Sequence, residues 1–266
     1  MHLWETRSRS LAALIVLAII ACACAGIAVG ESIQNKNLIV SLQGRITPHA
    51  LPRDELAPIT VHVSGAIKTD DGATPPALRK ISFALNRNGK LDTRGLPTCE
   101  SGVLESTTTE QARELCGPAL IGSGSFEANV AFPSLVPFPA EGKLLAFNAK
   151  VKGRPAILLH IYGANPVQHT FVLPMTISQQ ASGTYGTVIS ANIPQLAAGL
   201  GYVTSVDFAI GRQFHYKGKT HSLLSASCSA PAGFPGAIFL FAKGTFTFTN
   251  GQSLSPRLIR DCKVSK

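Results

Sequence analysis

Charged residues are scarce in this chain. Only 15% of its 266 residues are Asp, Glu, Lys or Arg. Glycine, proline, serine, threonine and phenylalanine are plentiful instead, with 24 glycines and 17 prolines. This composition is typical of many short strands joined by tight turns, and it argues against a helical fold.

The motifs of several well-known catalytic and metal centres are also missing. The sequence holds no H-E-x-x-H and no C-x-x-C, and GSGSF at 122–126 lacks the closing glycine of a nucleophile elbow. Asn86, Asn88 and Asp92 are spaced like oxygen ligands, but the aspartates and closing glutamate of an EF-hand loop are absent. A serine triad is assembled in space, so the sequence does not identify one. We therefore assign no catalytic residue, expect no cofactor, and favour a protein that is not an enzyme.

Residues 1–30 have the three parts of a secretory signal. Arg7 and Arg9 form a basic start, and the run from 11 to 30 carries no charge. The tripeptide ACA at 23–25 fits the small-x-small rule for cleavage after Ala25. The segment is therefore predicted to be a cleaved signal peptide.

Two other interpretations of this segment stay open. A run of about 20 apolar residues is long enough to cross a bilayer, which would make residues 1–30 an N-terminal membrane anchor. The stretch IIAC, which ends at Cys22, resembles a lipobox and would make Cys22 a lipidation site. It departs from the usual pattern, because isoleucine stands where leucine is commonest. All three interpretations predict export, to the extracellular space or attached to the cell envelope.

Beyond the leader, apolar and polar residues alternate with a period of two. In the segment 204–211, Val206, Phe208 and Ile210 share one face, which leaves the other face to polar side chains. One buried and one solvated face is typical of antiparallel sheets. About eleven or twelve such segments predict an all-β fold, an antiparallel β-sandwich or a jelly-roll-like fold. Strands continue on both sides of the proline-rich stretch 132–142, so residues 31–266 are predicted to form a single β-sandwich domain.

One or two short helices and several hairpins complete this pattern. The segment STTTEQARELCG at 106–117 predicts a helix with a capping box, formed by Thr107 or Thr108 with Glu110 or Gln111. Its apolar face would hold Ala112, Leu115 and Cys116. A second helical turn is expected in PQLAAGLG at 194–201. Pairs ending in glycine predict hairpin turns at 88–89, 217–218 and 250–251.

Two histidines form the one metal-site hypothesis. The segment LLHIYGANPVQHTF reads as a hairpin with its turn at 163–166. If Tyr162 pairs with Val167, His160 lies directly opposite His169, with their Cβ atoms about 5 Å apart. Both imidazoles would then reach one metal ion, although zinc or copper needs a third ligand that the sequence does not indicate. The alternative is that the two rings simply stack beside Tyr162.

Four cysteines stand outside the leader, namely Cys99, Cys116, Cys228 and Cys262. An even number in an exported chain predicts two disulfides, with three possible pairings. We expect Cys99–Cys116, which would clamp a Ser- and Thr-rich crossover, and Cys228–Cys262, which would pin the last strand to the sheet. In that register Ile238, Leu240, Phe246 and Phe248 share a face with Leu254, Leu258 and Cys262. The alternative is four buried free thiols, since the spacing does not fit a zinc site.

Several stretches together resemble a known group of sequences. They are ISFALNRNGKLDTRGLPTC, LCGPALIGSG, LLAFN, SLLSASCSAPAGFPGAIFLFAKGTF and RDCKV. They are similar to a family of uncharacterised exported proteins of actinobacteria, and the likeness covers most of 51–264. The resemblance implies export and a single domain. It supplies no catalytic residues.

The formal net charge is +9, and the basic residues are scattered apart from a loose cluster in the tail 257–266. A basic exported protein is suited to anionic cell-envelope polymers or to a membrane surface, although the charge also serves solubility. Nucleic-acid motifs are missing, so no nucleic acid partner is expected. We therefore predict a secreted or cell-surface protein with a binding or structural role. The alternative is an exported hydrolase of cell-envelope glycans or lipids, which a cleft lined by two close carboxylates would favour.

Overall fold

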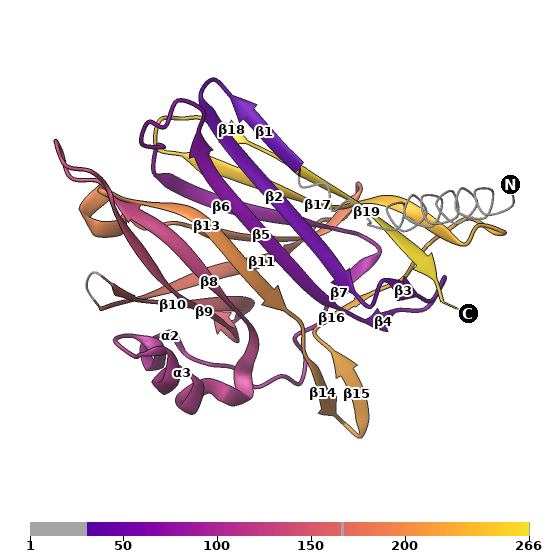
Figure 1. The fold of residues 1–266 in the computed structure, drawn as a ribbon. Coiled ribbons are helices and arrows are strands. Elements are labelled where there is room, and N and C mark those ends of the chain that lie inside the picture. The colour runs from indigo at the N-terminus through magenta and orange to yellow at the C-terminus, as the bar shows by residue number, and fades with distance from the viewer. Residues whose placement is uncertain (1–30, 166–167, 266) are drawn as a thin grey trace, which may run out of the picture.

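The computed structural model describes residues 31–165 and 168–265. The predicted leader, including Cys22, lies outside these residues. Among the described residues, no helix is both long and apolar enough to cross a membrane. Strands dominate the described chain, which confirms the prediction of an all-β, mainly antiparallel fold (Figure 1).

Fourteen strands form one large curled sheet in the order β1-β2-β5-β13-β8-β9-β10-β11-β12-β6-β17-β19-β3, with β18 paired to β17. Neighbouring strands are antiparallel, apart from the short parallel pair β19–β3. The bounds are β1 (Glu31–Asn35), β2 (Leu38–Thr47), β3 (Ala50–Leu51), β5 (Thr60–Thr69), β6 (Leu78–Asn86), β8 (Leu120–Val130), β9 (Phe138–Val151), β10 (Arg154–Asn165), β11 (His169–Gln179), β12 (Tyr185–Asn192), β13 (Gly201–Ile210), β17 (Gly236–Phe248), β18 (Ser253–Leu254) and β19 (Arg257–Val264).

Two smaller sheets lie beside the large one. The first is a hairpin of β14 (Gln213–Tyr216) and β15 (Lys219–Ser222), and the second joins β4 (Ala57–Pro58), β16 (Leu224–Ala226) and β7 (Gly89–Leu91). The described residues thus hold nineteen strands, more than the eleven or twelve that were predicted. The difference arises because strands of two to four residues pair within connections that the sequence pattern indicates as loops.

The large sheet curls so that its two halves face each other like the layers of a sandwich (Figure 1). Alternate side chains of both halves fill the space between them. Leu38 and Leu42 of β2 share this core with Phe248 of β17 and Leu258 of β19, and all four are almost fully buried. The core therefore draws on strands that lie far apart in the chain.

Side chains join the two ends of the curled sheet. The main-chain N–H of Ile259 in β19 donates to the Glu31 carboxylate over 2.6 Å. The amide of Gln252 donates to the carbonyl of Asn35 over 3.0 Å. These bonds hold β1 beside the β18–β19 end of the sheet and occupy polar groups that an open sheet edge would expose.

Two of the three predicted hairpins are confirmed. The turn at 217–218 joins β14 to β15, and the turn at 250–251 joins β17 to β18. The prediction of a hairpin at 88–89 is wrong, because the two strands beside this turn do not pair with each other. Strand β6 pairs with β12 and β17, whereas β7 pairs with β16. The chain turns there as expected, but the two strands separate into different sheets.

A register shift in β17 changes which of its side chains face the core. Phe246 and Phe248 are buried as predicted, but Ile238 is 78% exposed. The pairing with β19 slips between Leu240 and Ala242, so the side chains before this point turn to the opposite face. The predicted common face is therefore correct only for the later part of β17, together with the buried residues Leu254, Leu258 and Cys262.

A helical segment between β7 and β8 covers part of the outer face of the sheet (Figure 1). It contains α2 (Ser101–Leu104), α3 (Thr109–Cys116) and the 3₁₀ turn η1 (Gly117–Ala119). Thr108 caps α3 and forms the predicted capping box with Gln111. Ala112 and Cys116 are buried as expected, but Leu115 is exposed and does not belong to the apolar face. A second short helical turn, η2 (Leu196–Gly199), lies where it was predicted.

Residues 144–149 of β9 are buried on both faces by this arrangement. Ala146 points into the main core, whereas Leu145 and Phe147 pack with Leu104 and Ala112 of the helical segment. A strand covered on both sides carries a continuous apolar run. This explains why LLAFNA at 144–149 does not alternate.

Candidate functional site

An open cleft of about 430 Å³ lies between α3 and the outer face of β8 and β9. Three of its lining residues come from α3 and the rest from the two strands. Its charged side chains are Glu110, Arg113 and Lys143. The full lining is Thr109, Glu110, Arg113, Ser123, Gly124, Ser125, Lys143, Leu144 and Leu145.

The register of β8 with β9 places the polar side chains of the cleft on one face. Ser123 pairs with Leu145 and Ser125 pairs with Lys143. Residues that pair across two strands project from the same face of a sheet. Leu145 packs with the helical segment, so this is the outer face, which α3 overhangs. The strands thus supply two hydroxyls and one ammonium group to the floor of the cleft.

The other wall of the cleft is the first turn and a half of α3. Thr109 and Arg113 are four residues apart, which brings them to the same side of the helix. The helix start is fixed by the capping box, in which the Thr108 hydroxyl accepts from the Gln111 N–H over 3.3 Å and the Gln111 side chain accepts from the Thr108 N–H over 2.9 Å.

Thr109 is in an unusual state for a residue in the wall of a cleft. It is only 7% exposed, and its Oγ1 is buried without a hydrogen-bond partner among the described residues. Buried hydroxyls are nearly always paired, because an unpaired one costs about 1–3 kcal/mol of desolvation free energy. Because this Oγ1 has almost no accessible surface, it is not itself a contact for a ligand in the open cleft.

The two cations of the cleft are not neutralised by carboxylates. Among the described residues, the ion pairs join His49 to Asp261, and Lys90 and Arg94 to Asp92. Neither Arg113 nor Lys143 has a carboxylate within ion-pair distance in that part of the chain. Glu110 is the one carboxylate in the lining, so the cleft carries a net positive charge.

Two further carboxylates lie close together outside the cleft. Glu127 of β8 is directly opposite Glu141 of β9, with Cβ atoms about 5 Å apart for such a pair. Both side chains are exposed, and the Ser205 hydroxyl donates to Glu127 over 2.9 Å. Because neither lines the cleft, the cleft lacks the paired carboxylates that glycoside hydrolysis requires.

The predicted histidine pair is not formed. Strands β10 and β11 pair so that His160 is opposite Val172, whereas His169 is opposite Gly163. His169 is exposed and lies edge-on against Phe171, with ring centroids 4.2 Å apart. The register that the metal hypothesis required is therefore wrong. In the described ranges, no group of three or more His, Cys, Asp or Glu side chains is placed to hold a metal ion.

His160 instead anchors the turn between α2 and α3. Its side chain is fully buried, and Nε2 lies 3.0 Å from both the hydroxyl and the carbonyl oxygen of Thr107. The Thr107 hydroxyl donates to the Leu104 carbonyl over 2.7 Å, so the imidazole N–H is the donor toward Thr107. Thr170 of β11 also donates to the Thr107 carbonyl, over 2.8 Å. Burial lowers the pKa of His160, which keeps the ring neutral.

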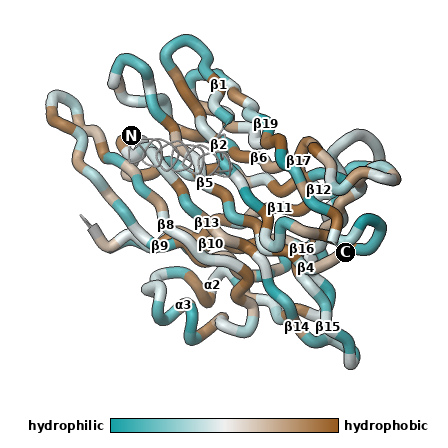
Figure 2. The backbone as a smooth tube through the Cα atoms, turned by 45° about the vertical axis from the view of Figure 1, so that its right-hand side comes forward, coloured by the Kyte–Doolittle hydropathy of each residue, from teal (hydrophilic) through white to brown (hydrophobic). Residues whose placement is uncertain are grey.

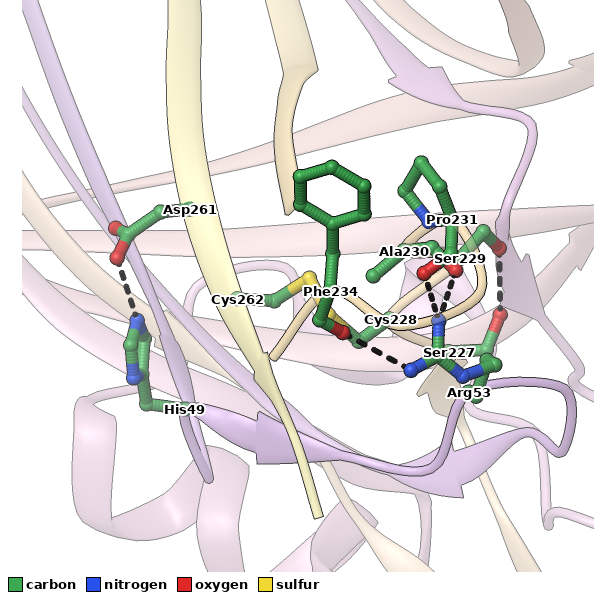
Figure 3. Close-up of a disulfide and its surroundings, with 10 residues drawn as sticks. All are labelled: His49, Arg53, Ser227, Cys228, Ser229, Ala230, Pro231, Phe234, Asp261 and Cys262. Atoms are coloured by element: carbon green, nitrogen blue, oxygen red, sulfur yellow. Dashed lines mark hydrogen bonds and ion pairs between the residues drawn. A yellow bond between two sulfur atoms is a disulfide. The ribbon is translucent and has the colours of Figure 1, made fainter. Parts of the chain in front are cut away.

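Both predicted disulfides are present. Cys99 is joined to Cys116 with their Cα atoms 5.6 Å apart, and Cys228 to Cys262 at 5.7 Å (Figure 3). The first bridge ties the end of α3 to the chain before α2, so it restrains the helix that carries Arg113. Structural disulfides of this kind are typical of proteins that fold in an oxidising compartment.

Arg53 holds the loop that follows Cys228. Its guanidinium donates to the carbonyls of Ala230, Pro231 and Phe234, the last two over 2.6 and 2.9 Å (Figure 3). The charge of Arg53 is thus used on main-chain oxygens of this loop, of which that of Pro231 also accepts from the Phe234 N–H over 3.1 Å. This region is a structural clamp and lies apart from the cleft.

Comparison with known proteins does not assign the cleft to a family. No protein-family model, no curated protein and no solved structure matches the chain. The chemistry of the cleft therefore has to be inferred from its own residues, and the resemblance to exported actinobacterial proteins stays a sequence-based prediction.

Proposed function

We propose that this chain is an exported binding protein whose cleft between α3 and β8–β9 binds a phosphate group of a cell-envelope component. One observation carries the proposal. The cleft brings together two cations, Arg113 and Lys143, that lack carboxylate partners among the described residues.

These groups suit a tetrahedral oxyanion. An Arg guanidinium offers paired N–H donors to two phosphate oxygens, and a Lys ammonium offers a compact charge with three donors. Ser123 and Ser125 add exposed hydroxyl donors beside them. Glu110 opposes the anion and limits its affinity, which suits a ligand that is bound reversibly.

Binding is better supported than hydrolysis. A serine nucleophile needs a neighbouring base, yet the lining of the cleft contains no imidazole. The Nε2 atom of His160 donates to Thr107 and the residue is outside the lining, as is the carboxylate pair of Glu127 and Glu141. The cleft thus has several donors that hold a ligand, whereas its one carboxylate, Glu110, has no second carboxylate or imidazole beside it in the lining.

The exported location rests on two independent features. The leader has the basic, apolar and small-residue parts of a secretory signal. The two disulfides agree with folding in an oxidising environment. Two cell-envelope sources of phosphate fit the proposal, a phosphodiester polymer of the wall and a phospholipid headgroup.

Calorimetric titration with two probes tests the proposal. The probes are a short poly(glycerol phosphate) and vesicles of phosphatidylglycerol, which separate the two sources of phosphate. We expect Arg113→Gln and Lys143→Gln each to weaken binding about tenfold, the loss of one charge-assisted contact. Glu110→Gln should strengthen binding severalfold, because it removes the opposing charge.

Matched controls come from β9 and the neighbouring strand β10. Lys150→Gln and Arg154→Gln remove the same charges from exposed positions outside the cleft and should leave the affinity unchanged. Equal losses in the cleft variants and in these controls would show that only the overall charge attracts the probe, and the proposal would then be wrong. Unchanged binding in Arg113→Gln and Lys143→Gln would refute it as well.

A further inference from the structure

The loop between β8 and β9 presents an exposed apolar surface. Phe132, Leu135 and Val136 are 42%, 66% and 87% exposed. Phe132 stacks on Phe138 with ring centroids 5.6 Å apart, so the aromatic base of the loop is ordered. The loop projects from one end of the molecule, and its residues are among the apolar ones in the hydropathy colouring (Figures 1 and 2). We call residues 131–137 the apolar tip.

A second uncharged loop supports the apolar tip. The main-chain N–H of Ala131 donates to the carbonyl of Leu200, which follows η2, over 3.0 Å. Neither chain segment carries a charge there, since residues 128–140 and 181–206 contain no Asp, Glu, Lys or Arg. The two segments themselves therefore carry no ionic group that would have to be dehydrated, and the nearest carboxylates on the hairpin, Glu127 and Glu141, lie three residues before its last pair.

We propose that the apolar tip inserts into the boundary between headgroups and acyl chains of a lipid bilayer. A stable protein interface buries about 800 Å² on each partner, which is more than three projecting side chains supply. A bilayer needs no matching surface, and it accepts apolar and aromatic side chains at its boundary.

The main chain of the tip is suited to an environment without water. Pro133 and Pro137 have no N–H group. The N–H groups of Ala131 and Leu135 already donate within the protein, the latter to the Phe132 carbonyl over 3.2 Å. The N–H groups of Phe132, Ser134 and Val136 are left, and at the headgroup boundary they stay hydrated, so the penalty for irregular chain in lipid is reduced.

The inference is independent of the proposed phosphate site, although the same two strands carry both. Ser125 lies five residues before the end of β8, about 17 Å along the strand. An inserted tip would hold the cleft within roughly 20 Å of the bilayer surface. A variant that loses phosphate binding should therefore still insert its apolar tip. Each proposal can be refuted without affecting the other.

Tryptophan fluorescence tests the insertion. In the full chain, Trp4→Phe removes the one native tryptophan, and Val136→Trp or Ile238→Trp then introduces a single probe. Ile238 is the matched control, because it is 78% exposed and apolar but lies on β17 beside Asp261 of β19. Because the leader is itself apolar, the readout is the environment of the introduced tryptophan and not total vesicle binding.

We expect vesicles of phosphatidylcholine to shift the emission of the tryptophan at 136 to shorter wavelength, and brominated lipid to quench it at least twofold. The probe at 238 should show neither change. Adding Leu135→Asp to the Val136→Trp variant should abolish the shift, because a carboxylate at the tip opposes insertion. An unshifted emission at 136, or the same change at both positions, overturns the proposal.

Discussion

The Nε2 atom of His160 lies 3.0 Å from both the hydroxyl and the carbonyl oxygen of Thr107. A buried ring on β10 thereby fixes the turn between two helices that have little core of their own. Thr109, which lines the cleft, is only two residues further along. The contact between His160 and Thr107 therefore both stabilises the fold and positions the wall of the proposed binding site.

Stability should decrease in mild acid because of His160. Burial lowers its pKa below the ordinary value of 6.5, so the unfolded chain takes up a proton before the folded protein does. The free energy of unfolding should be constant above about pH 6.5 and should fall as the pH decreases toward the folded pKa. Urea unfolding between pH 5 and 8 measures this slope.

The variant His160→Gln tests the origin of that slope. It keeps an N–H donor but does not titrate, so the dependence between pH 5 and 7 should flatten. Asp92 acts in a different range, because the Arg94 guanidinium holds the pKa of that carboxyl well below its usual value of 3.8. A slope that persists in His160→Gln would assign the effect to another group.

The histidine hairpin illustrates what the sequence can and cannot predict. The alternation in β10 and β11 identified two strands that do pair with each other. Their register depends on the position and length of the turn. The turn predicted at 163–166 gave the wrong register, so His160 is opposite Val172 and not opposite His169. In the same way, the register shift within β17 places Ile238 on the face opposite to the one predicted. One extra residue in a strand puts the side chains before it and after it on opposite faces.

Local features were predictable because their partners are close in the chain. The capping box of Thr108 and Gln111 depends on four consecutive residues, and the bridge between Cys99 and Cys116 closes a short loop. The cleft was missed because its walls come from 109–113 and from 123–145, which meet only when α3 lies across β8 and β9. The run LLAFNA at 144–149, apolar except for Asn148, was the one signal for a covering layer, since a strand exposed on one face would alternate.

The two disulfides should differ in what they support. Their sequence separations of 17 and 34 residues predict losses of about 3 and about 4 kcal/mol in the free energy of unfolding when each is removed. The Cys99→Ala/Cys116→Ala variant should also bind poly(glycerol phosphate) more weakly, because α3 is released. The Cys228→Ala/Cys262→Ala variant should lose stability but keep its affinity for poly(glycerol phosphate). Urea unfolding and calorimetry measure the two effects, and equal affinity losses would contradict this division.

Arg53 should stabilise the loop 228–235 through the fork of its guanidinium. Arg53→Met keeps the apolar stem but removes the donors to three carbonyls, so we expect a loss of about 1–3 kcal/mol in unfolding free energy. Arg53→Lys should not restore it, because one ammonium cannot reach carbonyls as a planar fork does. Full rescue by Lys would mean that charge alone matters at this position.

The leader should be removed after Ala25. Ala25→Phe places a large residue where the signal peptidase needs a small one, so processing should stop, whereas Ala21→Phe in the apolar run should leave it intact. Mass spectrometry of the exported protein should find Gly26 at the N-terminus, and a fatty-acid analogue should not label it. A label in the wild type that disappears in Cys22→Ala would instead establish lipidation at Cys22. An unprocessed chain in the membrane would establish the anchor, and an unprocessed chain in the cytosol would contradict export altogether.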